Sequence, residues 1–145
     1  MQRTAMRELA FKLVYEMEVQ KDENQMDIFL ENNEITDEKV IEYLKDIQNG
    51  IIEHSEEIDN LIKNNLKENW SLNRISKINL SLIKIAIYEM IYKNLPYKVA
   101  INEVVELAKK YGEEQSPNFI NGILANIVKK IGVEEWNIIQ YPLVN

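Results

Sequence analysis

The sequence predicts an all-α fold, a compact bundle of about six or seven helices. Apolar residues recur at spacings of three and four through most of the chain, which is the period of a helix with one buried face. Three prolines and four glycines in 145 residues leave little material for the turns of a β-protein. No alternation of apolar and polar residues outlasts the helical patterns. We expect one helical domain over residues 1–132 and a C-terminal tail over 133–145.

The first predicted helix runs from Thr4 to about Val19. Its apolar side chains recur along one face, which indicates a single buried stripe. That stripe consists of Met6, Leu9, Ala10, Leu13, Val14 and Met17. The mostly polar segment 20–36 is expected to form a loop with a short helix.

The next helix is predicted to begin after a cap at Thr36, and its apolar stripe continues to Ile62. Gly50 and the His54-Ser55 pair are places where this long stretch is expected to kink or divide. Ser55 suits the cap of a second piece, because a serine oxygen can accept a free N–H of the first helical turn.

After a connector with a helical turn, the segment that begins at Ser76 is apolar on nearly every side, which predicts a helix at the centre of the bundle. A further helix is expected from Lys98 to Tyr111, and Gly112 follows where a left-handed cap is expected. Ser116 is a capping residue followed by proline, a pattern that predicts the start of the last helix. Gly132 is expected to close it.

The residue types exclude most kinds of catalytic and metal site. There is no cysteine, and the single histidine, His54, lies on a mostly apolar stripe where a structural, partly buried role is expected. The glycines stand alone, so no phosphate-binding loop is present. We therefore predict a binding protein that is not an enzyme and has no cofactor.

The chain shows no sign of a membrane or export signal. No run approaches eighteen apolar residues, and the N-terminus lacks the pattern of a secretory signal, so we expect a cytoplasmic protein. Its net charge of −7 argues at first against nucleic acid. The acidity is concentrated in residues 21–70, which carry fourteen acidic and five basic side chains. That block is expected to be a solvated face or a surface for a basic partner.

Two regions combine polar or cationic side chains with aromatic rings. One flank of the first helix carries two cations and two rings, which are Arg3, Arg7, Phe11 and Tyr15. The last helix begins with amides beside Phe119. Single-stranded RNA is bound by cations that hold phosphates and by rings that stack on bases. Each residue also has a plain structural interpretation, because the aromatic rings suit a core and cations such as Lys109 and Lys110 offset a helix dipole.

Four sequence blocks together resemble the NusB family of bacterial transcription antitermination factors. They are RELAFKLVY at 7–15, LIKIAIYEM at 82–90, LPYKVAINEVVELAKKYG at 95–112 and FINGIL at 119–124. The resemblance implies two small helical subdomains and no catalytic residue. It also implies binding of boxA-type single-stranded RNA together with NusE, a ribosomal protein, and assembly with RNA polymerase and other Nus factors in the transcription of ribosomal RNA operons.

The resemblance also assigns roles to residues. The family's arginine-rich segment falls on Arg3 and Arg7, although Thr4, Ala5 and Met6 interrupt it, which predicts weaker and less salt-sensitive RNA binding. The RNA-facing tyrosine falls on Tyr15. The loop before the last helix differs from many relatives, which carry an acid, a histidine and a basic residue at positions 115, 117 and 118. The expected RNA-binding set is Arg3, Arg7, Tyr15, Lys109, Lys110, Gln115, Asn118, Phe119 and Asn121.

Other functions remain open from the sequence. A protein–protein adaptor with little RNA binding of its own is favoured by the acidity and by the interrupted arginines. The RNA-binding domain of an RNA cytosine methyltransferase has a similar fold, but it requires a following catalytic domain, and this chain ends at Asn145. A homodimer is also possible.

Overall fold

The computed structural model describes residues 1–22 and 24–131, and this part of the chain contains seven α-helices and no strand. Gly132 and the expected tail lie outside the described residues. The elements are α1 (Arg3–Gln20), α2 (Met26–Asn32), α3 (Glu38–Glu53), α4 (Ser55–Lys63), η1 (Leu72–Arg74), α5 (Lys77–Ile87), η2 (Tyr88–Tyr92), α6 (Tyr97–Tyr111) and α7 (Ser116–Ile131). The predicted all-helical fold is confirmed.

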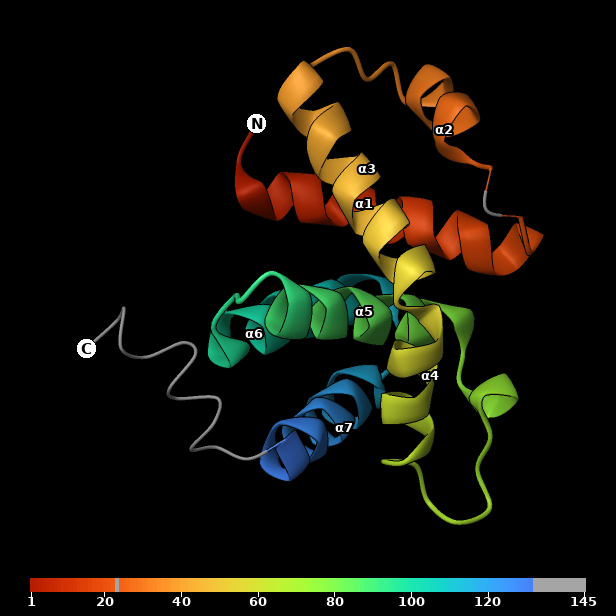
Figure 1. The fold of residues 1–145 in the computed structure, drawn as a ribbon, viewed down its shortest axis with the longest axis vertical. Coiled ribbons are helices and arrows are strands. Elements are labelled where there is room, and N and C mark those ends of the chain that lie inside the picture. The colour runs from red at the N-terminus through yellow and green to blue at the C-terminus, as the bar shows by residue number, and fades with distance from the viewer. Residues whose placement is uncertain (23, 132–145) are drawn as a thin grey trace.

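Helix α5 is the centre of the bundle, as its apolar composition predicts. It packs against α1, α3, α6 and α7, and Leu82, Ile83 and Ile85 are fully buried. Figure 1 shows α1, α2 and α3 at one end of the molecule and α4 and α7 at the other, with α5 and the adjacent α6 between them. This arrangement agrees with two small helical groups that share one core.

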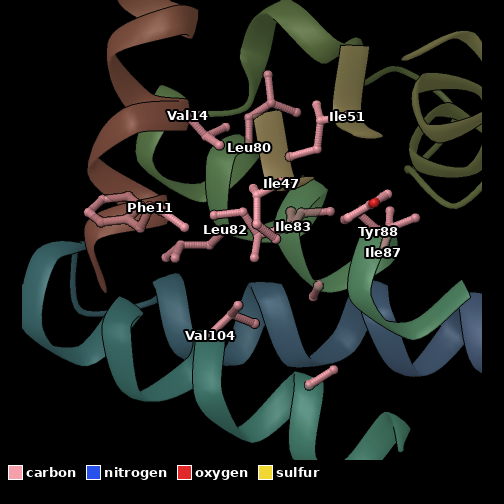
Figure 2. Packing of buried hydrophobic residues seen from close by; sticks show 14 of the residues in the cluster. Phe11, Val14, Ile47, Ile51, Leu80, Leu82, Ile83, Ile87, Tyr88 and Val104 are labelled. Atoms are coloured by element: carbon pink, nitrogen blue, oxygen red, sulfur yellow. The ribbon is translucent and has the colours of Figure 1, made fainter. Parts of the chain in front are cut away.

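The core joins side chains that are far apart in the sequence (Figure 2). Phe11 and Val14 of α1 lie on one side of α5, with Ile47 of α3 and Val104 of α6 also in the cluster. All four are 3% exposed or less. Phe11 is therefore a core residue, which is the structural interpretation that its sequence position left open.

Two predicted helix caps differ in the structure, and the first is at Ser55, which is itself the first residue of α4, a helix with no side-chain cap. Ser76, where the central apolar segment was expected to begin, caps α5, and its Oγ accepts the N–H of Asn79 at 3.1 Å. The cap of α3 is Asp37 and not Thr36, since the Asp37 carboxylate accepts the N–H of Lys39 at 2.9 Å. Both residue types are good caps, so the pattern located this helix start only to within one residue.

Gly112 does not adopt the predicted left-handed conformation. Its φ is −90° and its ψ is −170°, which is extended backbone. A Cβ there would lie 2.7 Å from the Ser116 side chain and 2.8 Å from the Ala108 carbonyl oxygen. The position thus requires glycine because the chain turns back closely toward α7. Ser116 contributes to this turn, because its Oγ accepts the N–H of Glu113 at 2.9 Å.

The long stretch after Asp37 divides at His54, as expected, with α3 ending at Glu53 and α4 beginning at Ser55. His54 is partly buried and its ring stacks on Tyr92 with the ring centres 3.7 Å apart. No described helix has the length and apolar character required to cross a membrane.

Candidate RNA interface

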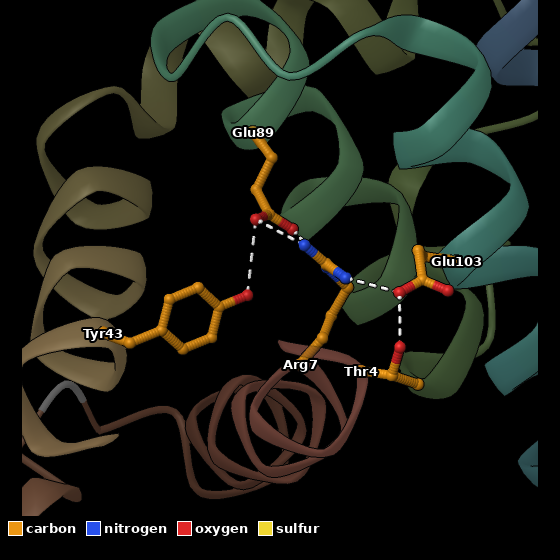
Figure 3. A network of polar contacts seen from close by, with 5 residues as sticks. All are labelled: Thr4, Arg7, Tyr43, Glu89 and Glu103. Atoms are coloured by element: carbon orange, nitrogen blue, oxygen red, sulfur yellow. Dashed lines mark hydrogen bonds and ion pairs between the residues drawn. The ribbon is translucent and has the colours of Figure 1, made fainter. Parts of the chain in front are cut away.

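Arg7 lies in the interior and not on the surface. It is 3% exposed, and its Nε donates to Glu89 Oε1 at 2.7 Å while its Nη1 donates to Glu103 Oε1 at 2.7 Å. Tyr43 donates to Glu89 Oε2 at 3.3 Å, and Thr4 donates to Glu103 at 3.0 Å (Figure 3). A phosphate contact was expected at Arg7, but its guanidinium is buried and paired with two carboxylates. Its carboxylate partners come from η2 and α6, which a pattern within one helix does not reveal.

The charges of this network stabilise one another. Burial alone would lower the pKa of Arg7, but the hydrogen bond and negative charge of Glu89 raise it above its ordinary value. Burial raises the pKa of Tyr43, and the Glu89 charge raises it further. Arg7 is thus a permanent cation inside the protein, paired with carboxylates from two other elements.

Arg3 is the exposed cation of the N-terminal segment. Its guanidinium carbon lies 5.3 Å from the centre of the Tyr43 ring, at the mouth of a 350 Å³ cleft that Lys93 also lines. A cation over an aromatic face keeps its charge available to solvent on the other side. Arg3 therefore meets the requirement for a phosphate contact.

Tyr15 lines a cleft of about 470 Å³ between α1, α2 and the end of α6. Its ring centre lies 6.1 Å from that of Phe11, which lies 5.1 Å from the ring centre of Tyr111. Lys12 Nζ and Lys110 Nζ lie 5.9 and 5.3 Å from the centre of the Tyr111 ring. We call Tyr15, Tyr111, Lys12 and Lys110 the Tyr15 cluster. The structure thus brings two predicted residues together and adds Lys12 and Tyr111, which the predicted RNA-binding set does not contain.

The two predicted lysines of α6 are exposed but paired with acids. Lys110 Nζ lies 2.6 Å from Glu8 Oε2, and Lys109 Nζ lies 2.6 Å from Glu106 Oε2. Tyr111 also donates to Glu8. The hydrogen bond from Lys110 is the main cause that lowers the pKa of Glu8, and Tyr111 adds to it. Both ammonium groups face solvent, so a phosphate can compete for them.

The other predicted residues divide between two surfaces of α7. Asn118 and Phe119 line a 280 Å³ pocket with Trp70, and Gln115, at the start of α7, donates to Glu113 at 3.1 Å. Asn121 lines a separate groove between α6 and α7 with a volume of about 420 Å³. The predicted set therefore does not form one patch, although the Tyr15 cluster and the α7 N-terminus are joined by the short turn at 112–115. Within the described residues, no group of three or more acidic or histidine side chains is arranged to hold a metal ion.

The sequence matches known proteins over most of its length. The model of the NusB family matches residues 4–129. The transcription antitermination protein NusB of Acetivibrio thermocellus is 46% identical over 132 residues, which are 89% of this chain and 90% of that protein. The protein of the same name from Clostridium novyi is 44% identical, over 89% of this chain and 99% of that protein.

Solved structures agree with the sequence comparison. NusB of T. maritima superposes with a TM-score of 0.80 at 38% identity, covering 89% of this chain and 92% of that one. A crystal structure of antitermination factors NusB and NusE in complex with double-stranded RNA superposes with a TM-score of 0.78 at 26% identity. That match covers 88% of this chain and 96% of the solved one.

Proposed function

Because this chain belongs to the NusB family, we propose that it is a transcription antitermination factor that binds boxA-type single-stranded RNA together with NusE. The family is one of non-catalytic RNA-binding factors, so the protein is not an enzyme. In this proposal the protein–RNA–NusE complex joins RNA polymerase and other Nus factors in the cytoplasm and suppresses termination in ribosomal RNA operons. The solved complex of a similar NusB with NusE and RNA supports the choice of partners.

The Tyr15 cluster is the observation that carries the proposal. Two tyrosine rings line one open cleft, and two lysine ammonium groups lie within 6 Å of the Tyr111 ring centre. Rings of this kind stack on unpaired bases, and the lysines neutralise the phosphates that join them. Arg3, Lys109, Gln115, Asn118 and Phe119 extend the proposed contact surface. Arg7 acts by holding α1 in place, and Asn121 faces another groove.

NusE is proposed to supply positive charge that this chain lacks. The net charge is −7, and Lys109 and Lys110 of α6 are already paired with glutamates. Phosphate binding by the chain alone is therefore expected to be weak. A basic partner bound beside the cleft would strengthen it by adding counter-charges and by fixing the RNA path.

The test is a titration of labelled boxA-type RNA with the protein alone and with NusE. Tighter binding with NusE is expected, and equal affinity in both titrations contradicts the proposed role of NusE. Tyr15→Asp should weaken RNA binding with unchanged helical circular dichroism. Asn60→Asp is the matched control, since it adds the same charge on an exposed site of α4. NusE binding without any RNA binding would instead indicate a protein–protein adaptor.

A further inference from the structure

A second aromatic pocket lies between the connector after α4 and the start of α7. Trp70 is 44% exposed, and its ring centre lies 6.2 Å from that of Phe119 with an angle of 32° between the ring planes. The pocket they line has a volume of about 280 Å³. An exposed tryptophan beside a partly buried phenylalanine is a large apolar surface to leave in water, which points to a ligand.

One wall of this pocket has no side chain. Gly122 lies on α7 one turn after Asn118, and a Cβ placed on it would meet no atom within 4 Å. Glycine destabilises a helix interior relative to alanine, and Gly122 makes no close approach that would require it. The open space beside its backbone leaves room for a flat ring.

The polar groups around the pocket suit a nucleotide. Exposed amides of Asn118 and Asn126 and the exposed ammonium of Lys67 line it. Among the described residues that line it, none is acidic, although the chain has 24 acidic residues. Amides pair with the edges of bases, and an ammonium attracts phosphate. The volume lies below the roughly 300–1,000 Å³ of typical small-molecule sites, which favours a single ring over a whole cofactor.

We propose that this pocket, here called the Trp70 pocket, binds one unpaired nucleobase of the RNA. The base stacks on Trp70 and Phe119 over the open side of Gly122, while Asn118 and Asn126 hydrogen-bond to its edge. This inference rests on the proposed function, because it assumes that RNA is bound. It adds Trp70, Gly122 and Asn126 to the interface and places a base-reading site beyond the Tyr15 cluster.

Tryptophan emission tests the stacking directly. The chain has two tryptophans, so Trp136→Phe leaves Trp70 as the only one. Adding boxA-type single-stranded RNA to this variant with NusE should quench the Trp70 emission in step with RNA binding measured by anisotropy of a labelled RNA. RNA that binds without changing the Trp70 emission contradicts the proposal.

Two substitutions test the contribution to affinity. Trp70→Ala should weaken RNA binding roughly 5- to 150-fold, as expected for the loss of one base stack, and Trp70→Phe should keep most of the affinity. Gly122→Met fills the pocket with a better helix former, so it should weaken RNA binding without lowering the thermal midpoint. Ala125→Met is the control, because Ala125 is exposed on the same helix but lines the other groove.

The outcomes separate this inference from the function on which it rests. A wild-type protein that binds no RNA with NusE present overturns both. RNA binding that is equal in the wild type and Gly122→Met overturns the nucleobase pocket alone. If Gly122→Met weakens NusE binding in the absence of RNA, the pocket is a protein contact and the assignment to a base is wrong.

Discussion

Arg7 and Glu89 form a bidentate ion pair inside the molecule, with N–O distances of 2.7 and 3.1 Å. Arg7 is 3% exposed and Glu89 is 5% exposed. Glu89 lies in the π-helical turn η2, and its carbonyl oxygen accepts the N–H of Leu95 at 2.9 Å. The pair therefore ties α1 to the segment that leads into α6, and this fixes the position of the Tyr15 cluster between those two helices.

Arg7→Ala should lower the free energy of unfolding by about 3–5 kcal/mol, because it leaves the Glu89 charge buried without its partner. Urea unfolding followed by circular dichroism measures this loss. The double variant Arg7→Met with Glu89→Met should be much more stable than Arg7→Ala, since the Glu89 carboxylate is no longer buried without its partner. An Arg7→Ala protein of wild-type stability that has lost RNA binding would show that Arg7 contacts RNA.

Arg3→Ala should weaken RNA binding and leave the stability nearly unchanged. Arg3 is exposed and its guanidinium lies over the face of Tyr43, so stability should change by about 0.5 kcal/mol or less. RNA affinity should fall, and the slope of log affinity against log salt should become shallower by about 0.7, as for one lost phosphate contact on a single strand. An unchanged salt slope would remove Arg3 from the RNA interface.

The positions of the helices were predictable because their signals are local. The first helix was expected from Thr4 to Val19 and is observed from Arg3 to Gln20. The start of the central helix near Ser76 and the division near His54 also depend on neighbouring residues alone. The left-handed conformation predicted for Gly112 was wrong. The position requires glycine because the backbone lies close to Ser116.

The candidate site was predictable in part. Tyr15 was identified from the resemblance, but its neighbour Tyr111 was not, because 96 residues separate them in the chain and only the packing of α1 on the end of α6 brings them together. The interior position of Arg7 was hidden for the same reason. Trp70 lies in the connector after α4 and its partner Phe119 lies on α7, so no pattern within one segment reveals the pair.

Glu8→Gln should strengthen RNA binding. The Glu8 carboxylate holds Lys110 at 2.6 Å and places a negative charge beside the Tyr15 cleft. Removing that charge frees Lys110 for a phosphate contact. The slope of log RNA affinity against log salt concentration should therefore become steeper by about 0.7. The cost in stability should stay within about 1 kcal/mol because the pair is on the surface. Glu106→Gln, which removes the partner of Lys109 on α6, is a comparison, and weaker RNA binding by Glu8→Gln would contradict the prediction.

The stability of the protein should fall above pH 10 through Tyr43. Burial raises the pKa of this phenol above its ordinary value of 10.0, and Glu89 raises it further. Above pH 10 the unfolded chain releases the Tyr43 proton while the folded chain retains it, so the stability present below pH 10 is lost as the pH rises. The proton of Tyr43 can lower the free energy of unfolding by at most about 1.4 kcal/mol per pH unit. Urea unfolding from pH 9 to 11.5 measures this loss. The free energy of unfolding should decline less steeply for Tyr43→Phe than for the wild type, and an identical decline would contradict the role of Tyr43.

Gly50→Ala should destabilise the protein although alanine is the better helix former. A Cβ at Gly50 would lie 2.1 Å from the Tyr88 ring, and Tyr88 is 5% exposed and donates to Asp46 Oδ1 at 2.7 Å. The ring has to move and the hydrogen bond has to lengthen, so the overpacking loss of about 1–3 kcal/mol should exceed the gain of about 0.5–1 kcal/mol from replacing glycine.

The same substitution at an open site is the control for Gly50→Ala. Gly122→Ala adds its Cβ where no atom lies within 4 Å, so it should raise the free energy of unfolding by about 0.5–1 kcal/mol. A double-mutant cycle of Gly50→Ala with Tyr88→Leu isolates the clash, because leucine lacks the ring atoms that the new Cβ would meet. The double variant should be more stable than the sum of the single effects predicts, by about 1–3 kcal/mol. Additive effects would show that the Tyr88 ring does not account for the glycine at position 50.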